Sequence, residues 1–380
     1  MKMSDEKIVV AFVSWTLIGM GGSEHVVYDI ARKLDRKHFS VIIISFEDGP
    51  VRYLYEEIGI KVHVLLKKKK NDINFYQRFR KILNKEKIDI INAHHYYPFI
   101  YSFIATIGTS IKLIYTEHSR WQLEQLPIAK KILNIIMLRK SDALVAISKQ
   151  IEDYYLHRLR INPIKICQIS NGVDLDIYKK KVESKIKQDI GLQLHEKTIG
   201  MVANLRPEKN HKLLISAFVN VVKVMKDVRL ILIGLDCMNG EIQSFANQTS
   251  VSDKIHFLGQ REDIPELLSI LDIICLPSQY EGLPLTILEG MACGVPVVGS
   301  DVLGISEVVE HDVNGLLFPL NDERKLTDTL LLVLNDSKLR DRFSKDGRLF
   351  VIQNYSLDKK VGEYERLFRS IFYGQYFLSS

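Results

Sequence analysis

The chain alternates twice between short apolar runs and segments of helical period, and this alternation constrains the fold more than any other feature. Runs such as "SVIIISF" (40–46) and "DALVAIS" (142–148) lack polar alternation, which indicates strands buried on both faces. Between such runs lie segments such as 23–34, where apolar residues recur every three or four positions. Helices covering both faces of a parallel sheet satisfy both patterns. The predicted fold class is therefore α/β, with doubly wound, Rossmann-like sheets.

The predicted strands fall into two groups, as expected for a chain of 380 residues that is long for one domain. The first group comprises 7–15, 40–46, 61–66, 88–94, 111–116 and 142–148, and the second comprises 198–204, 228–234, 254–259, 271–277 and 295–300. The charged segment 179–197 between them is predicted to be a linker. We expect domains at 1–178 and 198–358 that face each other across a cleft, and a helical tail, 359–380, that returns toward the first domain.

Composition argues against several classes of protein. The four cysteines are scattered without a CxxC pair, so neither a disulfide framework nor a zinc site is expected, and a reducing cytosol fits. The net charge of +6 is too small to demand nucleic acid, and no extended basic face with stacking aromatics is evident. The apolar stretch 8–20 is too short to span a bilayer and lacks the features of a secretory leader. We expect a cytoplasmic protein that does not bind nucleic acid.

A glycine-rich loop, "GMGGSEH" (19–25), follows the first predicted strand. Gly21 and Gly22 allow close backbone approach to a ligand, and the next helix offers unpaired N–H groups and a positive dipole end. Glu24 replaces the third glycine of a dinucleotide-binding motif, and no Gly-Lys-Ser/Thr follows, which disfavours nicotinamide and Walker sites. Phosphate binding and a tight turn that requires glycine both remain open for this loop.

Two loops of the second predicted domain carry charged residues. "ANLRPEKNH" (203–211) places Arg206 and Lys209 after a strand, where cations either neutralise a diphosphate or remain solvated. "YEGLPLTILEGMACGVPVV" (280–298) places Glu281 before a helix.

The helix in the second of these loops is expected to begin at Pro284, whose fixed φ and missing N–H suit the first helical position. Glu289 then lies in the second turn, where it is suited to bind ribose hydroxyls, while Glu281 is suited to bind the hydroxyls of a sugar. Exposed backbone N–H groups around Gly282 and Leu283 add donors.

These motifs together resemble the family-four glycosyltransferases of the GT-B fold. The motifs are Gly21-Gly22-Ser23-Glu24, Asn171-Gly172-Val173-Asp174, Glu208-Lys209, the stretch from Glu281 to Glu289, and "SEVVEHDVNGLLFP" (306–319). They occur in the family's order along nearly the whole chain. The resemblance implies a retaining, metal-independent glycosyltransferase of hexosyltransferase type that uses a nucleotide-diphosphate-sugar donor. It also implies a role in building surface polysaccharide, such as capsule, exopolysaccharide or lipopolysaccharide.

The resemblance also implies roles for individual residues. Gly21, Gly22 and Lys209, with an arginine, would bind the donor diphosphate, Glu289 the ribose, and Glu281 the transferred sugar. Donor contacts are also expected from Asn204, Arg206, Gly282, Leu283 and Pro284.

Asn204 stands where the family has an arginine, so Arg206, two residues later, is the candidate replacement. His118, in "TEHS", matches a family histidine that faces the donor sugar, although a locally satisfied histidine at a strand end is the alternative. Glu281, His118 and Lys209 are therefore the expected catalytic residues. His94 and His95 are expected on the acceptor side, and no cofactor or metal is expected.

Two alternatives remain at this stage. A nucleotide-sugar epimerase of the same fold would turn over donor without an acceptor. A non-catalytic nucleotide-sugar-binding protein would bind donor and leave it intact.

An anionic membrane surface and a glycan or lipid-linked acceptor are the further expected partners. The segment 67–87 begins with four lysines and continues with Phe75, Phe79, Ile82 and Leu83 at near-helical spacing. Such a basic amphipathic segment is predicted to dock peripherally on the inner face of the cell membrane. The alternative is an ordinary helix that packs its apolar face on the sheet.

Overall fold

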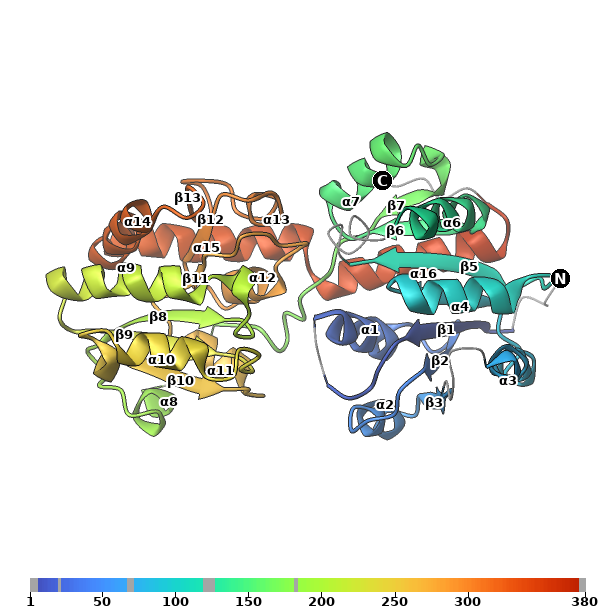
Figure 1. Ribbon diagram of the computed structural model, residues 1–380, viewed down its shortest axis with the longest axis horizontal. Coiled ribbons are helices and arrows are strands. Elements are labelled where there is room, and N and C mark those ends of the chain that lie inside the picture. Colours follow the sequence, from blue (N-terminus) through green and yellow to red (C-terminus); the bar gives the residue numbers. More distant parts are fainter. Residues whose placement is uncertain (1–5, 20–21, 67–71, 119–126, 181–183, 376–380) are drawn as a thin grey trace. The chain divides into compact units, whose positions relative to one another are not determined.

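The computed structural model describes residues 6–19, 22–66, 72–118, 127–180 and 184–375 (Figure 1). The chain forms two compact units. The first comprises Met1–Gly172 together with Leu357–Ser380, and the second comprises Val173–Ser356.

The first unit is built on a parallel sheet of seven strands within the described residues, in the order β3-β2-β1-β4-β5-β6-β7. Its strands are β1 (Ile8–Ser14), β2 (Phe39–Ser45), β3 (Lys61–Val64), β4 (Ile90–His94), β5 (Lys112–Glu117), β6 (Ala143–Ala146) and β7 (Ile166–Gln168). Its helices are α1 (Gly22–Lys33), α2 (Arg52–Glu57), α3 (Ile73–Lys85), α4 (Tyr96–Thr106), α6 (Ile128–Lys140), α7 (Lys149–Asp153), the π-helix η1 (Tyr154–Arg158), the 3-10 helix η2 (Pro163–Lys165) and α16 (Leu357–Phe372).

The second unit repeats this architecture with six parallel strands among the described residues, in the order β10-β9-β8-β11-β12-β13. Its strands are β8 (Lys197–Val202), β9 (Val228–Ile233), β10 (Ile255–Gly259), β11 (Ile273–Leu276), β12 (Val297–Ser300) and β13 (Leu316–Phe318). Its helices are α8 (Ser184–Asp189), α9 (His211–Val224), α10 (Glu241–Asn247), α11 (Ile264–Ser269), α12 (Leu285–Ala292), α13 (Leu303–Ser306), α14 (Glu323–Asn335), α15 (Ser337–Asn354) and the 3-10 helices η3 (Pro207–Lys209) and η4 (Ser252–Lys254).

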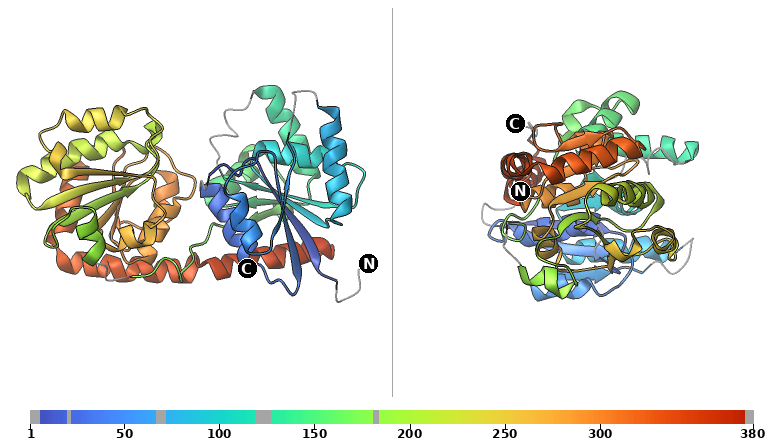
Figure 2. Two further views of the ribbon diagram at one scale, coloured as in Figure 1. Left: turned by 90° about the horizontal axis from the view of Figure 1, so that it is seen from below. Right: turned by 90° about the vertical axis from the view of Figure 1, so that its left-hand side faces the viewer.

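Strand burial explains the parallel arrangement. In β1 and β2 nearly every residue is buried, and the two strands pair in register from Ile8 with Phe39 to Ser14 with Ser45. Figure 2 shows helices on both sides of the strands within each unit. The predicted α/β class with two doubly wound parallel sheets is confirmed.

The described residues of the predicted linker, 179–180 and 184–197, belong to the second unit. They include α8, whose Ile186 is buried, and Leu192 beyond the helix is buried as well. Lys187 Nζ donates to the carbonyl of Glu196, 2.9 Å away, which closes the segment onto the start of β8. Two buried apolar side chains and this hydrogen bond thus connect the described part of the segment to the second unit.

The chain passes between the units at the Asn-Gly-Val-Asp motif. Val173 N donates to Tyr355 O over 2.8 Å, and a Cβ added at Gly172 would lie 2.7 Å from the Cα of Leu357. The units therefore divide after Gly172 and before Leu357, whereas the sequence placed these divisions at 178 and 358.

Helix α16 belongs to the first unit although it ends the chain. Lys33 Nζ forms an ion pair with Asp358, and the backbone N–H of Asp35 donates to Glu365, 2.8 Å away. Phe368 packs edge-on against Phe12 of β1. A strand from the beginning of the chain and a helix from its end thus share one core.

The apolar face of α3 packs into the core of the first unit and does not face a membrane. Phe75, Phe79 and Leu83 are each no more than 1% exposed. Phe46, just beyond β2, contacts the rings of Phe75 and Phe79. The ordinary packed helix was therefore the correct interpretation of α3, and the lysines that begin the predicted segment, within 67–71, lie outside the described residues.

Replacing Phe79 with alanine should destabilise the first unit, because it removes a fully buried ring from this cluster. We expect a loss of roughly 3–5 kcal/mol in the free energy of unfolding. Urea unfolding followed by circular dichroism measures it. The matched control is Tyr53→Ala, whose ring on α2 is 53% exposed. Equal losses in the two variants would contradict the assignment of α3 to the core.

Candidate active site

The strand order of the second sheet reverses between β8 and β11, so the loops that follow these two strands meet at its carboxyl edge. The loops are 203–210 and 277–284. The backbone N–H of Gln279 donates to the carbonyl of Glu208 over 2.8 Å and ties one loop to the other. Ligands of open parallel sheets bind at such a reversal.

Lys209 and Glu281 form an ion pair between these loops. Lys209 Nζ lies 2.6 Å from Glu281 Oε1, and the hydroxyl of Ser278 donates to the same oxygen over 2.6 Å. The lysine side chain is 24% exposed and the glutamate side chain 11%. A charge-assisted bond at this partial burial holds both side chains in place. Two of the predicted catalytic residues are thus brought into contact.

The backbone of Glu281 is packed against α13. A Cβ added at Gly304 would lie 2.3 Å from the carbonyl oxygen of Glu281, so only glycine allows this approach. Ser300, at the end of β12, donates its hydroxyl to Ser278 O over 2.5 Å. Sequence reasoning missed Ser278, Ser300 and Gly304. Only Ser278 carried a local signal, its position three residues before Glu281.

The remaining predicted residues of 203–210 lie beside this pair. Arg206 is exposed at the start of η3, and its charge acts on the Tyr280 hydroxyl, as do those of Glu208 and Glu281. Burial and the two carboxylates raise the pKa of Tyr280. The side-chain oxygen of Asn204 accepts from the N–H of Leu235 over 3.0 Å, which joins the loop after β8 to the loop after β9.

Helix α12 begins one residue later than the sequence predicted. Pro284 has φ −77° and ψ 96°, which is not helical, so it is the N-cap and Leu285 is the first helical residue. Leu283 is buried, and Gly282 is half-buried. Glu289 still lies in the second turn, half-buried.

Three predicted histidines come together at the carboxyl edge of the first sheet. His94 Nδ1 lies 2.8 Å from His118 Nε2, and their rings stack with centroids 5.1 Å apart. The His95 and His118 ring centroids are 4.9 Å apart. Gly22 opens α1 in the same unit, and Gly21 lies outside the described residues.

The histidine cluster contacts the buried carboxylate of Glu117. Glu117 Oε1 accepts from the backbone N–H of His118 at 2.8 Å, and His95 Nδ1 lies 4.0 Å from the same oxygen. The hydroxyl of Tyr115 donates to the other carboxylate oxygen. His95 has φ +70°, a conformation rare for a side chain of this size, and such strain is characteristic of functional positions.

Burial sets the charge of this cluster. It lowers the pKa of His94 to about 3, assisted by the nearby charge of His95. Burial also lowers the pKa of His118 well below its ordinary value, with contributions from His95 and His94. The two rings are therefore neutral at pH 7, and one donates to the other across the 2.8 Å contact.

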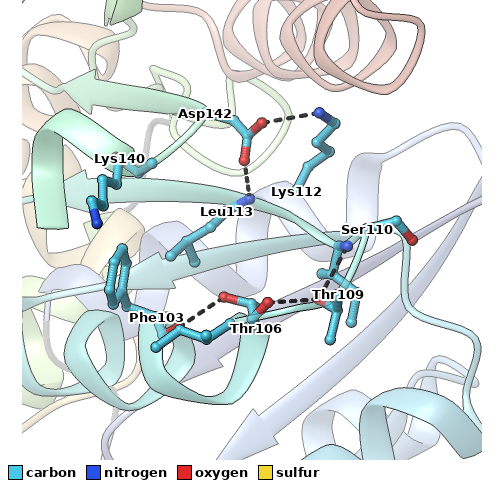
Figure 3. Close-up of a pocket in the computed structure, with 11 residues that line it drawn as sticks. Phe103, Thr106, Thr109, Ser110, Lys112, Leu113, Lys140 and Asp142 are labelled. Atoms are coloured by element: carbon cyan, nitrogen blue, oxygen red, sulfur yellow. Dashed lines mark hydrogen bonds and ion pairs between the residues drawn. The ribbon is translucent and has the colours of Figure 1, made fainter.

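A separate cavity of about 290 Å³ lies at the opposite edge of the first sheet (Figure 3). It is lined by the C-terminal ends of α4 and α6 and by the first residues of β5. The ion pair between Asp142 and Lys112, 3.1 Å apart, lies on its wall, and Asp142 also accepts from the N–H of Leu113. This edge carries the amino ends of the strands, where parallel sheets do not place their ligands.

Two family models match the chain. The model described as "Glycos_transf_1: Glycosyl transferases group 1" matches residues 182–350, and "Glycosyltransferase Family 4" matches residues 20–177.

Two curated proteins match along almost their whole length. The chain is 26% identical to N-acetyl-alpha-D-glucosaminyl L-malate synthase of Bacillus anthracis, covering 93% of this chain and 94% of the relative. It is also 26% identical to UDP-Gal:alpha-D-GlcNAc-diphosphoundecaprenol alpha-1,3-galactosyltransferase of Escherichia coli, covering 97% and 98%.

A solved structure, HepE of Anabaena in complex with UDP and glucose, superimposes with a TM-score of 0.85 at 22% identity. The superposition covers 96% of this chain and 100% of the HepE chain. This similarity confirms the predicted GT-B fold.

The buried histidines should make stability depend on pH. Between pH 7 and pH 5 the unfolded chain protonates His94 while the folded chain does not, so the free energy of unfolding falls as the pH falls. Because the pKa of His94 in the folded state is about 3, this residue accounts for about 2 kcal/mol of the fall in the free energy of unfolding between pH 7 and pH 5. His94→Asn removes this contribution, and urea unfolding at pH 7 and pH 5 measures the difference in the free energy of unfolding.

The control is His157→Asn, at a side chain 76% exposed, which should retain the wild-type difference between the two pH values. An undiminished difference in His94→Asn would contradict the buried neutral histidine.

The contact at Gly304 gives a second prediction. Gly304→Ala should displace the backbone of Glu281 and lower the rate of glycosyl transfer by about 10²-fold, the scale expected when a group is moved by about an ångström. Steady-state kinetics measures it. The control is Gly362→Ala in α16, where a Cβ would meet only the tip of Arg366 at 3.8 Å. Wild-type turnover in Gly304→Ala would show that the position of Glu281 does not matter.

Proposed function

This chain belongs to the family-four glycosyltransferases of the GT-B fold, and we propose that it moves a sugar from a nucleotide-diphosphate donor to an acceptor hydroxyl with retention of configuration. The observation that carries this proposal is the Lys209–Glu281 pair at the reversal point of the second sheet. It combines a cation for the departing diphosphate with a carboxylate for sugar hydroxyls.

A uridine diphosphate sugar is the proposed donor. HepE of Anabaena was solved with UDP and with UDP-glucose, and the Escherichia coli relative is named for a UDP-galactose donor. In our proposal the loops after β8 and β11 bind the diphosphate, and Glu289 in the second turn of α12 binds the ribose.

The proposed chemistry has an oxocarbenium-like transition state in which negative charge develops on the departing phosphate. Fixed positive charge at that place is among the largest contributions to such a reaction. Lys209 supplies that charge, and Ser278 keeps a hydrogen bond to Glu281 when the lysine turns to the phosphate. We propose that the enzyme needs no metal, because the basic side chains and the N-terminus of α12 carry this charge.

Neutral His118 is the proposed partner of the donor sugar. Because its pKa is depressed, it binds sugar hydroxyls through hydrogen bonds without adding a second positive charge beside the developing oxocarbenium ion. His94 orients it through the 2.8 Å contact between their ring nitrogens. His94 is thus a positioning residue, and His95 remains the proposed acceptor-side residue.

The proposed pathway is the synthesis of surface polysaccharide. The relatives include a galactosyltransferase that acts on a diphosphoundecaprenol-linked sugar, and a lipopolysaccharide core mannosyltransferase of Rhizobium meliloti. A glycan or lipid-linked acceptor follows for this chain as a proposal.

The test of this function is release of UDP from UDP-sugars with and without added glycan or lipid-linked acceptors. A transferase releases UDP faster with its acceptor and forms a product heavier by one sugar. An epimerase converts the donor without acceptor and releases no UDP, and a non-catalytic binding protein does neither. Either of these last two outcomes would overturn the proposal.

Lys209→Ala should lower the turnover rate by roughly 10²–10³-fold, as expected when a charge-stabilising group is removed. The control is Lys212→Ala, which removes a lysine three residues away whose exposed pair with Glu241 lies outside the loop. Lys212→Ala should retain the wild-type rate. If Lys209→Ala also retained the wild-type rate, the Lys209–Glu281 pair would only stabilise the fold and the proposed role of Lys209 would be wrong.

Arg206→Ala tests the displaced arginine separately. A loss of at least about tenfold, with weaker UDP binding by calorimetry, is expected if its guanidinium contacts the diphosphate. Full activity would show that Arg206 does not replace the family's arginine and that Lys209 acts without it.

A further inference from the structure

Three aromatic side chains contact one another at the carboxyl edge of the first sheet, and the proposed reaction uses none of them. They are called here the aromatic platform and are Trp15, directly after β1, and Tyr97 and Tyr101 of α4. The ring centroids of Trp15 and Tyr97 lie 5.7 Å apart, and each lies 6.5 Å from that of Tyr101. Trp15 is 36% exposed and Tyr97 is 47% exposed. Exposed apolar surface that is gathered in one place marks a binding site.

The aromatic platform lies where the strand order of the first sheet reverses. After β1 the chain continues to β2 on one side, and after β4 it continues to β5 on the other, while β1 and β4 are neighbours. Continuing their register from its last pair, Val13 with Ala93, brings Trp15 level with His95. Open parallel sheets bind ligands at such a reversal. The platform therefore occupies the ligand-binding position of the first sheet, as the ion pair of the second unit does in its own sheet.

The core below holds the aromatic platform in a fixed position. Phe46, 3% exposed, meets the rings of Trp15 and Tyr101 edge-on, with centroids 6.1 Å and 5.4 Å away. The carbonyl of Trp15 accepts from the backbone N–H of Phe46 over 3.2 Å. Tyr101 also contacts Phe75, which is buried on α3. Rings that are fixed in this way lose little conformational freedom when a ligand binds.

The chemistry of the platform indicates a sugar ring as its ligand. One face of a pyranose presents C–H bonds, whose positive ends are attracted by the negative face of an aromatic ring. The hydroxyls at the rim of the sugar need polar partners, and the Trp15 indole N–H and the Tyr97 hydroxyl are suited to this role. Lys130 Nζ lies 5.7 Å from the ring centroid of Tyr97 and adds a cationic donor beside it. A ligand with an apolar face and a polar rim satisfies both parts of this surface.

We propose that the aromatic platform stacks against a pyranose ring of the acceptor glycan, so that Trp15 and Tyr97 determine which acceptors this chain uses. His95 connects this place with the histidine cluster, since it is level with Trp15 and its ring centroid lies 4.9 Å from that of His118. That the bound sugar is an acceptor rests on the proposed function. Binding of a sugar ring to the platform does not, because it needs no reaction.

The first test measures binding of free glycosides. The probes are the methyl pyranosides of glucose, galactose and N-acetylglucosamine, and the control ligand is glucitol, an open-chain polyol without a C–H face. The sequence contains two tryptophans, so Trp121→Phe leaves Trp15 as the only source of tryptophan fluorescence. At least one glycoside should change this fluorescence saturably, and glucitol should leave it unchanged.

Variants of Tyr97 then test the stacking itself. Tyr97→Ala should weaken glycoside binding by about tenfold, whereas Tyr97→Phe, which keeps the ring, should bind within about threefold of the wild type. Both variants should unfold thermally as the wild type does, because the side chain is exposed.

The matched control is Tyr373→Ala, at a ring of the same unit that is 54% exposed. Tyr373 directly follows α16, whose Arg369 lies 5.3 Å from the ring centroid of Phe39, the first residue of β2. The control ring therefore belongs to the amino edge of the sheet, and its loss should leave glycoside binding unchanged.

The second test uses the acceptor that the UDP-release assay identifies. Tyr97→Ala should raise KM for this acceptor by about tenfold and leave the affinity for UDP, measured by calorimetry, unchanged. If the proposed function were wrong, the wild type would transfer no sugar and would still bind a glycoside at Trp15. The two failures are thus distinguishable.

Three results would overturn the proposal. The first is that none of the three glycosides changes the fluorescence of Trp15, and the second is that Tyr97→Ala binds them as tightly as the wild type does. The third is that Tyr97→Ala weakens binding of UDP and not of the glycosides, which would assign the platform to the base of the donor.

Discussion

Both faces of each parallel sheet are covered by helices, and this coverage decides where the molecule can perform chemistry. Strands buried on both sides consist largely of aliphatic residues, so ligand-binding groups gather where the strands end. In the second unit these ends carry the Lys209–Glu281 pair, and in the first they carry His94, His95 and His118. Helix N-termini meet the same edges and add N–H donors. The position of the candidate residues within each unit thus follows from how the core of that unit is built.

The sequence predicted the long strands well because each is an uninterrupted apolar run. It missed β7 and β13, which have three residues each, too few for a pattern to stand out from a loop. It also treated 179–197 as a linker, because charge outweighed the scattered apolar residues there, of which Ile186 and Leu192 are buried. Packing decides such short segments, and it depends on residues far away in the chain.

The residues of the candidate site also differ in whether a local pattern or only the packing of distant residues reveals them. Lys209 and Glu281 were recognisable because their loops carry local signals, namely strand ends, proline and glycine. Gly304 gave none, because its role is to let α13 approach the carbonyl of Glu281, and that contact exists only once the sheet has formed. The coupling of His94 to His118 was likewise hidden, since it depends on the register between β4 and β5. The sequence assigned His94 to the acceptor side and His118 to the donor side, whereas one hydrogen bond joins their rings.

The helices α3 and α6 show why periodicity alone cannot identify an exposed apolar surface. In α3 a clear apolar stripe between basic residues is a core face, with Phe75 and Phe79 fully buried. In α6 apolar residues occur all around the helix, a pattern typical of a buried element. Its outer isoleucines became informative only when their exposure was known. An amphipathic pattern shows that one face is buried, and the identity of the burying partner follows from the tertiary structure.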